Sequence, residues 1–240
     1  MIGLQYHWMT KTINLLSGVL ALIALTLGEG SLRFGADSLR TAHSLRTADS
    51  LEIDERPLPW NCSAPRPASA VVDVAVIHFS SNAVKRPKDP YRLEEVLAVF
   101  RKHKVSAHYM IDREGGIHRL VDESRSAFHA GKGRYRYDPA RTDRLNETSI
   151  GIEILAVGSA HDMLPFMTEA GHARIPKHLV GFAPEQYASL KRLLADLHKR
   201  YPQLLLDSHH VIGHDEYAPG RKTDPGELFD WEAIGVKLVR

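Results

Sequence analysis

The 240-residue sequence contains a single cysteine, Cys62. One cysteine cannot form a disulfide within the chain, and it cannot supply the several thiolates of a cysteine-rich zinc site. A metal site in this protein must therefore use histidine and carboxylate ligands. The sequence has the histidines for such a site, because it contains 14 of them.

An excess of charge of one sign is also missing. The chain has 31 lysine and arginine residues against 29 aspartate and glutamate residues, a formal net charge of +2, with no long basic run. Proteins that follow a nucleic-acid backbone concentrate positive charge on one face or in one run. We therefore expect no nucleic-acid partner. The hydrophobic content of 43% is typical of a soluble protein with one good-sized core.

No apolar run reaches the roughly 20 residues that a membrane-spanning helix prefers. The longest run, residues 13–27, follows a basic start and has the length of the apolar part of a signal peptide. A buried core helix is the alternative, but the run is apolar on all sides and a polar tract follows it. We expect residues 1–30 to be a signal peptide or membrane anchor, and the protein to be exported to the periplasm or the extracellular space. N-terminal membrane attachment stays open because no clean cleavage site follows.

A short tandem repeat comes next, with SLRTAH at residues 38–43 and SLRTAD at residues 44–49. Two units are too few for a repeat domain, so residues 31–56 are interpreted as a flexible linker. Four prolines then keep the chain extended and mark the start of a folded domain over residues 57–240: Pro57, Pro59, Pro65 and Pro67.

Residues 71–240 alternate between strand and helix patterns. The β-branched run 71–77 predicts a strand buried on both faces, and 149–155 predicts another, with Ile150, Ile152 and Ile154 facing one side and Glu153 the other. Further patterns predict a hairpin of 107–111 and 117–121, helices over 93–104 and 184–201, a strand at 210–213 and an irregular insertion over 156–178. The fold class is α/β, with a mixed central sheet flanked by helices.

Three residues near predicted strand ends could bind a metal ion. His78 follows the first strand, His214 follows the last, and Asp224 comes ten residues later. Two imidazoles and one carboxylate are typical ligands of catalytic zinc and leave a fourth position for water. The alternative is that both histidines have structural roles and that Asp224, which precedes a proline, only begins a turn. Spacing alone leaves the choice open.

Five sequence blocks closely resemble type 2 N-acetylmuramoyl-L-alanine amidases, a family that includes AmpD-like enzymes, phage amidases and peptidoglycan recognition proteins. They occur in the family's order from about residue 70 onward and leave the first 56 residues uncovered. The blocks are IHFS at 77–80, SAHYMIDREG at 106–115, AFHAG at 127–131, NETSIGIE at 146–153 and GHDEYAPGRKTDPG at 213–226.

The resemblance implies a zinc amidase that cuts the bond between the lactyl group of N-acetylmuramic acid and L-alanine, in peptidoglycan or in muropeptides. It also implies a zinc site at the strand ends in a surface groove. The family's zinc ligands fall on His78, His214 and Asp224, its catalytic glutamate on Glu153 and its catalytic lysine on Lys222. Without the resemblance, Glu153 would be interpreted as a solvated strand carboxylate and Lys222 as an ordinary loop lysine.

Substrate binding is assigned to His129, Asn146 and Arg221, for which local loop hydrogen bonds are the alternative. The sequence departs from the family at two positions. Ala107 stands where some members have a tyrosine that assists catalysis, so Tyr109 should not be assumed to replace it. Phe79 stands where relatives often have a polar residue that contacts substrate.

We therefore expect an exported peptidoglycan amidase. Two other interpretations remain. A non-catalytic peptidoglycan-binding protein of the same fold is disfavoured by the complete set of ligands and catalytic residues. A cytoplasmic recycling amidase that acts on soluble anhydro-muropeptides is disfavoured by the N-terminal segment.

Overall fold

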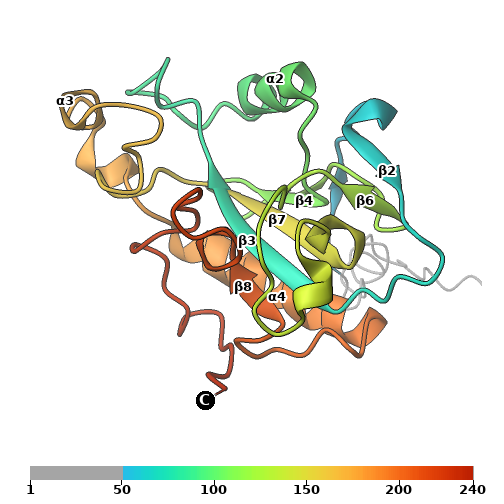
Figure 1. Cartoon of the computed structure of the whole chain (residues 1–240). Helices are drawn as coiled ribbons and strands as arrows, with labels where there is room; N and C mark the ends of the chain where they lie inside the picture. Colours follow the sequence, from blue (N-terminus) through green and yellow to red (C-terminus); the bar gives the residue numbers. More distant parts are fainter. Residues whose placement is uncertain (1–50, 240) are drawn as a thin grey trace, which may run out of the picture. The chain divides into compact units, whose positions relative to one another are not determined.

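A computed structural model describes residues 51–239 (Figure 1). The signal or anchor segment expected over residues 1–30, and the linker up to residue 50, lie outside the described residues. Within the part that is described, no helix is both long and apolar enough to cross a membrane.

A six-stranded mixed sheet forms the centre, in the order β1-β5-β4-β7-β3-β8. Neighbouring strands run parallel except for the antiparallel β4 and β5. The expected α/β class with a mixed sheet is thereby confirmed. The strands are β1 (Asp54–Glu55), β3 (Val74–Ser80), β4 (Tyr109–Ile111), β5 (Ile117–Arg119), β7 (Ser149–Leu155) and β8 (Val211–Gly213), and a separate two-stranded sheet pairs β2 (Ser63–Pro65) with β6 (Arg125–Ala127).

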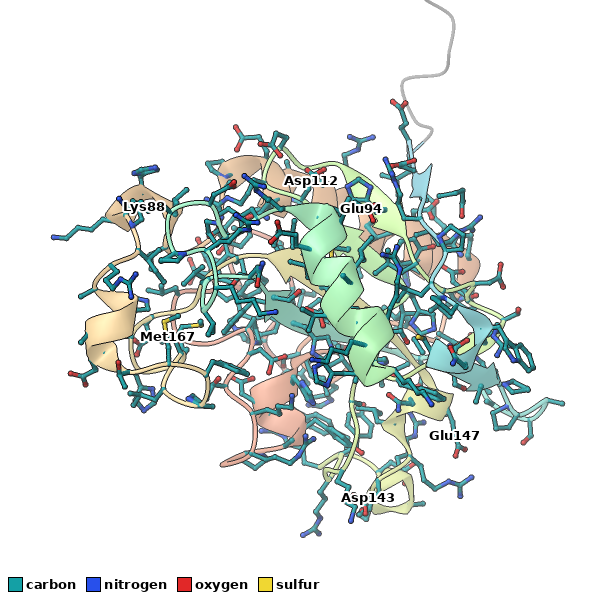
Figure 2. The ribbon with its side chains drawn as sticks, turned by 90° about the horizontal axis from the view of Figure 1, so that it is seen from above. Lys88, Glu94, Asp112, Asp143, Glu147 and Met167 are labelled. Atoms are coloured by element: carbon teal, nitrogen blue, oxygen red, sulfur yellow. The ribbon has the colours of Figure 1, made fainter. Side chains whose placement is uncertain are left out.

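The helices cover the two faces of the sheet. The helix α4 (Pro184–Arg200) packs its leucines against Ile150, Ile152 and Ile154 of β7 on one face. The helix α2 (Leu93–His103) packs Val96, Leu97 and Phe100 against Met110 and Leu155 on the other. Figure 2 looks down on α2, which carries the labelled Glu94. The shorter helical elements are η1 (Trp60–Cys62), η2 (Pro139–Arg141), η3 (Leu145–Glu147), α3 (Glu169–His172), η4 (Lys177–Leu179) and α5 (His214–Tyr217).

The strand β3 begins and ends three residues later than the apolar run predicted. It pairs with β7 residue for residue, from Val74 opposite Ser149 to Ser80 opposite Leu155. Hydrophobicity alone ended the predicted strand before His78, but backbone pairing with β7 continues through polar residues that face a cleft. His78 therefore lies within the strand, not after it.

Residues ahead of the domain start expected at residue 57 contact the sheet. The strand β1 adds to the sheet by pairing with β5, and Leu51 and Ile53 pack against the core on the α4 side. A two-residue strand leaves no periodic signal in the sequence, which is why these residues were assigned to the linker.

The insertion over 156–178 has little regular structure, as expected, but it is well packed. A bridge between Val157 and Gly181 closes its base. Met163 and Ile175 are buried in one cluster with Phe79. Both views place the insertion to one side of α2, and Figure 2 labels its Met167.

Candidate active site

The two central parallel strands carry the first pair of site residues. His78 of β3 lies opposite Glu153 of β7 in the strand register. Paired residues of adjacent strands project from the same face of a sheet. The relative exposure of His78 is 2% and that of Glu153 is 9%, so both side chains are buried, and both line one cleft.

The chain after β8 supplies two further residues. His214 is the first residue of α5, directly after Gly213, which pairs with Ile77 of β3. The backbone N–H of Asp215 donates to the carbonyl of Asp224 at 2.8 Å, which holds the Asp224 loop against α5. Strand pairing and this hydrogen bond bring both side chains beside His78.

The three candidate metal ligands converge. Nδ1 of His78 lies 2.7 Å from Oδ2 of Asp224, and Nδ1 of His214 lies 3.0 Å from the same oxygen. Within residues 51–239, these three side chains are the group found suitable for holding a metal ion, with one ligand atom from each inside a 4.8 Å range. All three are buried.

The hydrogen bonds around His214 fit a bound cation. Its Nε2 lies 2.8 Å from the carbonyl oxygen of Ala130, so the proton of a neutral ring belongs on Nε2. Nδ1 of the same ring lies against the Asp224 carboxylate, where either a proton or a metal ion can sit between the two atoms. A backbone carbonyl that orients a histidine in this way is usual behind metal ligands.

The ionisation of the other two ligands also suits a metal ion. Burial, followed by the neighbouring His214, lowers the pKa of His78 to about 4, so its imidazole is neutral at pH 7. Burial raises the pKa of Asp224, but hydrogen bonds with His214 and His78 outweigh it and hold that pKa well below its usual range. The site thus offers the neutral imidazole of His78 and the carboxylate of Asp224.

Glu153 has the character of a proton-transfer group. Burial, together with the nearby negative charge of Asp224, raises the pKa of Glu153 to about 8, and the Ser80 hydroxyl and the positive charge of Lys222 oppose the shift. Its Oε2 atom is buried and has no hydrogen-bond partner among the described residues. A carboxyl group with a pKa near neutrality can both accept and release a proton at working pH.

Lys222 is half-buried and lines the same cleft as Glu153. The polar part of the cleft is completed by the three candidate ligands, His129, Ser80 and Ser106. Its apolar part is formed by Phe79, Phe100, Val105, Phe128 and Phe166.

The three residues assigned to substrate binding occupy different places. His129 lines the cleft, with its Nδ1 3.1 Å from Nε2 of His78. Asn146 accepts hydrogen bonds from the backbone N–H groups of His129 and Ala130, and Arg221 donates to the carbonyl of Ala130 at 2.8 Å. The cleft-lining residues include neither Asn146 nor Arg221, and both instead hold the 129–132 loop.

The departures from the family pattern have visible consequences. Tyr109 is buried on the α4 side of the sheet, where its hydroxyl donates to Glu123, so it does not replace the tyrosine absent at Ala107. Phe79 packs against the insertion and contributes an apolar wall to the cleft. Sequence reasoning missed the Ala130 carbonyl, because any residue can supply a backbone oxygen, and Phe166, because no motif covers the insertion.

Taken together, a mixed α/β sheet with a buried His, His, Asp group beside a glutamate and a lysine offers the kinds of side chain that metal-dependent hydrolases use. The chain belongs to the N-acetylmuramoyl-L-alanine amidase family, whose model matches residues 67–227. The enzyme class expected from the sequence is confirmed.

Two curated relatives show the extent of the similarity. The chain is 31% identical over 199 residues to the 1,6-anhydro-N-acetylmuramyl-L-alanine amidase AmpD of Haemophilus influenzae, covering 78% of this chain and 88% of AmpD. It is 32% identical over 175 residues to the N-acetylmuramoyl-L-alanine amidase AmiD of Escherichia coli, covering 70% of this chain but only 54% of AmiD.

Solved structures of AmpD and AmiD match the fold of this chain. A crystal structure of AmpD matches with a TM-score of 0.55 at 26% identity, covering 79% of this chain and 96% of that one. Escherichia coli AmiD, in complex with the substrate anhydro-N-acetylmuramic acid-L-Ala-D-γ-Glu-L-Lys, matches with a TM-score of 0.51 at 30% identity, covering 70% of this chain and 59% of AmiD.

Proposed function

We propose that this enzyme uses zinc to hydrolyse the amide bond between N-acetylmuramic acid and L-alanine in muropeptides, with His78, His214 and Asp224 as zinc ligands. The observation that carries the proposal is the buried carboxyl of Glu153 beside the candidate ligands, because its Oε2 atom has no hydrogen-bond partner among the described residues. Bound zinc would polarise the amide carbonyl and lower the pKa of water from about 15.7 toward about 7.

Glu153 is the proton carrier in this proposal. It takes a proton from the attacking water as the new carbon–oxygen bond forms, and it delivers a proton to the L-alanine nitrogen as the carbon–nitrogen bond breaks. A pKa of about 8 suits both steps, because the group is neither a strong acid nor always protonated near pH 7.

Lys222 stabilises the negative charge that develops on the carbonyl oxygen. Its ammonium group lines the cleft with Glu153, and no hydrogen-bond or ion-pair partner occupies it among residues 51–239. A cation in a partly water-excluded cleft stabilises a developing oxyanion more than the neutral amide that precedes it.

The three residues assigned to substrate binding have two different roles: one contacts substrate, and the other two hold a loop beside the site. His129 contacts substrate from the wall of the cleft and also positions the His78 ring. Asn146 and Arg221 shape the groove through the 129–132 loop, whose Ala130 carbonyl orients His214.

The substrates of the relatives support soluble anhydro-muropeptides as substrates here. AmpD is named as a 1,6-anhydro-N-acetylmuramyl-L-alanine amidase. AmpDh3 of Pseudomonas aeruginosa, solved in complex with anhydromuramic pentapeptide, matches this chain with a TM-score of 0.51 at 28% identity and covers 69% of it and 60% of AmpDh3.

Export is a separate part of the proposal and rests on the apolar run at residues 13–27 and its basic start. A fusion of residues 1–50 to a reporter that is active only after export tests it. An inactive reporter retained in the cytoplasm would favour the recycling role inside the cell instead.

The hydrolytic function is tested with purified protein, anhydro-N-acetylmuramic acid-L-Ala-D-γ-Glu-L-Lys and, in parallel, purified sacculi. Mass spectrometry should detect a free peptide that begins with L-alanine. A chelator should stop the reaction and added zinc should restore it. Binding of the muropeptide without any cleavage would instead identify a non-catalytic binding protein.

A further inference from the structure

Phe166 is an exposed aromatic residue at the cleft. Its relative exposure is 53%, yet it lines the same cleft as His78, Glu153 and Lys222. A phenylalanine ring left in water loses the free energy that burial against an apolar surface would provide. Its position beside the reacting groups indicates that the substrate provides this surface.

Hydrogen bonds hold the segment that carries Phe166 to residues 222–227, the loop that carries Lys222 and Asp224, here called the catalytic loop. The Asp162 carboxylate accepts hydrogen bonds from the Ser159 N–H at 3.1 Å and from the Glu227 N–H at 3.3 Å, and the Thr223 hydroxyl donates to the Asp162 carbonyl at 2.8 Å. Thr223 lies between Lys222 and Asp224. The insertion and the catalytic loop are therefore joined by direct hydrogen bonds.

Packing of a neighbouring residue also holds the backbone that carries the ring. Met163, which is 3% exposed, is buried with Phe79 and Ile175, and the Phe166 N–H donates to the Met163 carbonyl at 2.9 Å. The backbone at Phe166 is thus held in place beside the cleft that its side chain lines. A preformed contact surface can discriminate between substrates because little ordering is needed on binding.

The chemistry of the substrate indicates which part meets the ring. The γ-glutamyl and lysyl residues beyond L-alanine carry charged groups, for which an apolar wall offers no partner. The lactyl and alanyl methyl groups are small and adjoin the amide that must reach Glu153. The sugar ring is the part with a broad face of C–H groups that matches a phenyl ring.

We propose that Phe166 stacks on the C–H face of the muramic acid sugar and makes the enzyme select muropeptides over peptides that carry only the lactyl group. This inference rests on the proposed amidase function and deepens it. Phe166 is then a specificity-determining residue supplied by the insertion.

The test compares two substrates that share the scissile amide. One is anhydro-N-acetylmuramic acid-L-Ala-D-γ-Glu-L-Lys, and the other is D-lactoyl-L-Ala-D-γ-Glu-L-Lys, which lacks the sugar. Phe166→Ala should lower kcat/KM about tenfold for the first and leave the second within about twofold, with zinc content unchanged. Phe166→Trp, which keeps an aromatic face, should retain the preference for the sugar.

Leu164→Ala is the matched control. Leu164 belongs to the same insertion and is 50% exposed, but it is not among the residues that line the cleft. This variant should change neither kcat/KM value. Equal losses on both substrates with Phe166→Ala, or no loss on either, would overturn the stacking proposal.

Binding of the same two ligands to chelator-treated protein, measured by calorimetry, gives the comparison without turnover. If the wild-type protein bound the muropeptide but cleaved neither compound, the amidase proposal would fail. The effect of Phe166→Ala on the two affinities would still decide whether the ring contacts the sugar, so the two failures are distinguishable.

Discussion

His78 and Glu153 lie opposite each other on adjacent parallel strands, and their side chains enter the same cleft. The separation between a candidate metal ligand and the candidate proton carrier is therefore set by backbone pairing in the middle of the sheet. His214 is tied to the same strand, because β8 pairs with β3 up to the residue before it. The paired central strands of the sheet thus position these candidate groups relative to one another.

The first prediction concerns the three candidate ligands. Replacing His78, His214 or Asp224 with alanine removes one protein ligand from the site, so zinc should be lost or bound much more weakly, and activity should fall with it. Metal analysis of each purified variant, together with muropeptide hydrolysis, checks this.

His198→Ala serves as the control for histidine replacement, because His198 hydrogen-bonds the Leu204 carbonyl and lies outside the cleft. It should keep its zinc. A ligand variant that retained stoichiometric zinc and full turnover would remove that residue from the metal site.

The second prediction separates chemistry from metal binding. Glu153→Gln keeps the size of the side chain and all three ligands but cannot take a proton. The variant should retain zinc and bind muropeptide while losing on the order of 10²-fold or more in kcat. Loss of zinc, or nearly full activity with zinc bound, would mean that another group activates the water.

The third prediction concerns Lys222. Lys222→Ala should also keep its metal, and it should lower kcat more than it raises KM, because an oxyanion donor acts mainly on the transition state. The expected loss in kcat is about 10²-fold or more. Lys88→Ala removes an exposed lysine outside the cleft lining and should leave the kinetics unchanged. Equal behaviour of the two variants would contradict the assignment.

The sequence was most informative about the face of each strand and about the candidate site residues. Both depend on a few residue types that occur in a fixed order. The alternation in residues 149–155 placed the three isoleucines and Glu153 on opposite faces, and the structure agrees. The motif blocks pointed to His78, His214 and Asp224, which the fold brings together.

Other features left no such signal. Hydrophobicity ended the predicted strand before His78, because only pairing with β7 shows that the strand continues. The roles of Asn146 and Arg221 in holding a loop depend on backbone groups, and any residue provides those. The insertion packs through Met163 and Ile175, whose spacing follows neither strand nor helix periodicity.

The fourth prediction concerns where the folded domain begins. Removing residues 1–50 should leave both the thermal midpoint and the activity on soluble muropeptide unchanged. Removing residues 1–56 also deletes β1 and the partly buried Leu51 and Ile53, so the midpoint should fall by roughly 4–8 °C. Calorimetry of the two truncated proteins checks this, and identical midpoints would place the start of the stable domain at residue 57.

The last prediction is a pH dependence in zinc-free protein. Glu153 has a folded pKa of about 8 and an ordinary value of 4.5, so the folded state holds a proton that the unfolded state releases across this range. Glu153 therefore stabilises the fold fully below pH 4.5, and this contribution is lost as the pH rises through 8. His78 acts in the opposite direction, but only between its folded pKa of about 4 and its ordinary value of 6.5.

Between about pH 6.5 and 8, the contribution of Glu153 is thus separated from that of His78. In chelator-treated wild-type protein, the free energy of unfolding should fall across this window by up to about 1.4 kcal/mol per pH unit. Glu153→Gln has no proton to release and should give a flatter profile in the same window. Urea unfolding at a series of pH values measures both, and parallel profiles would show that the buried carboxyl does not retain its proton.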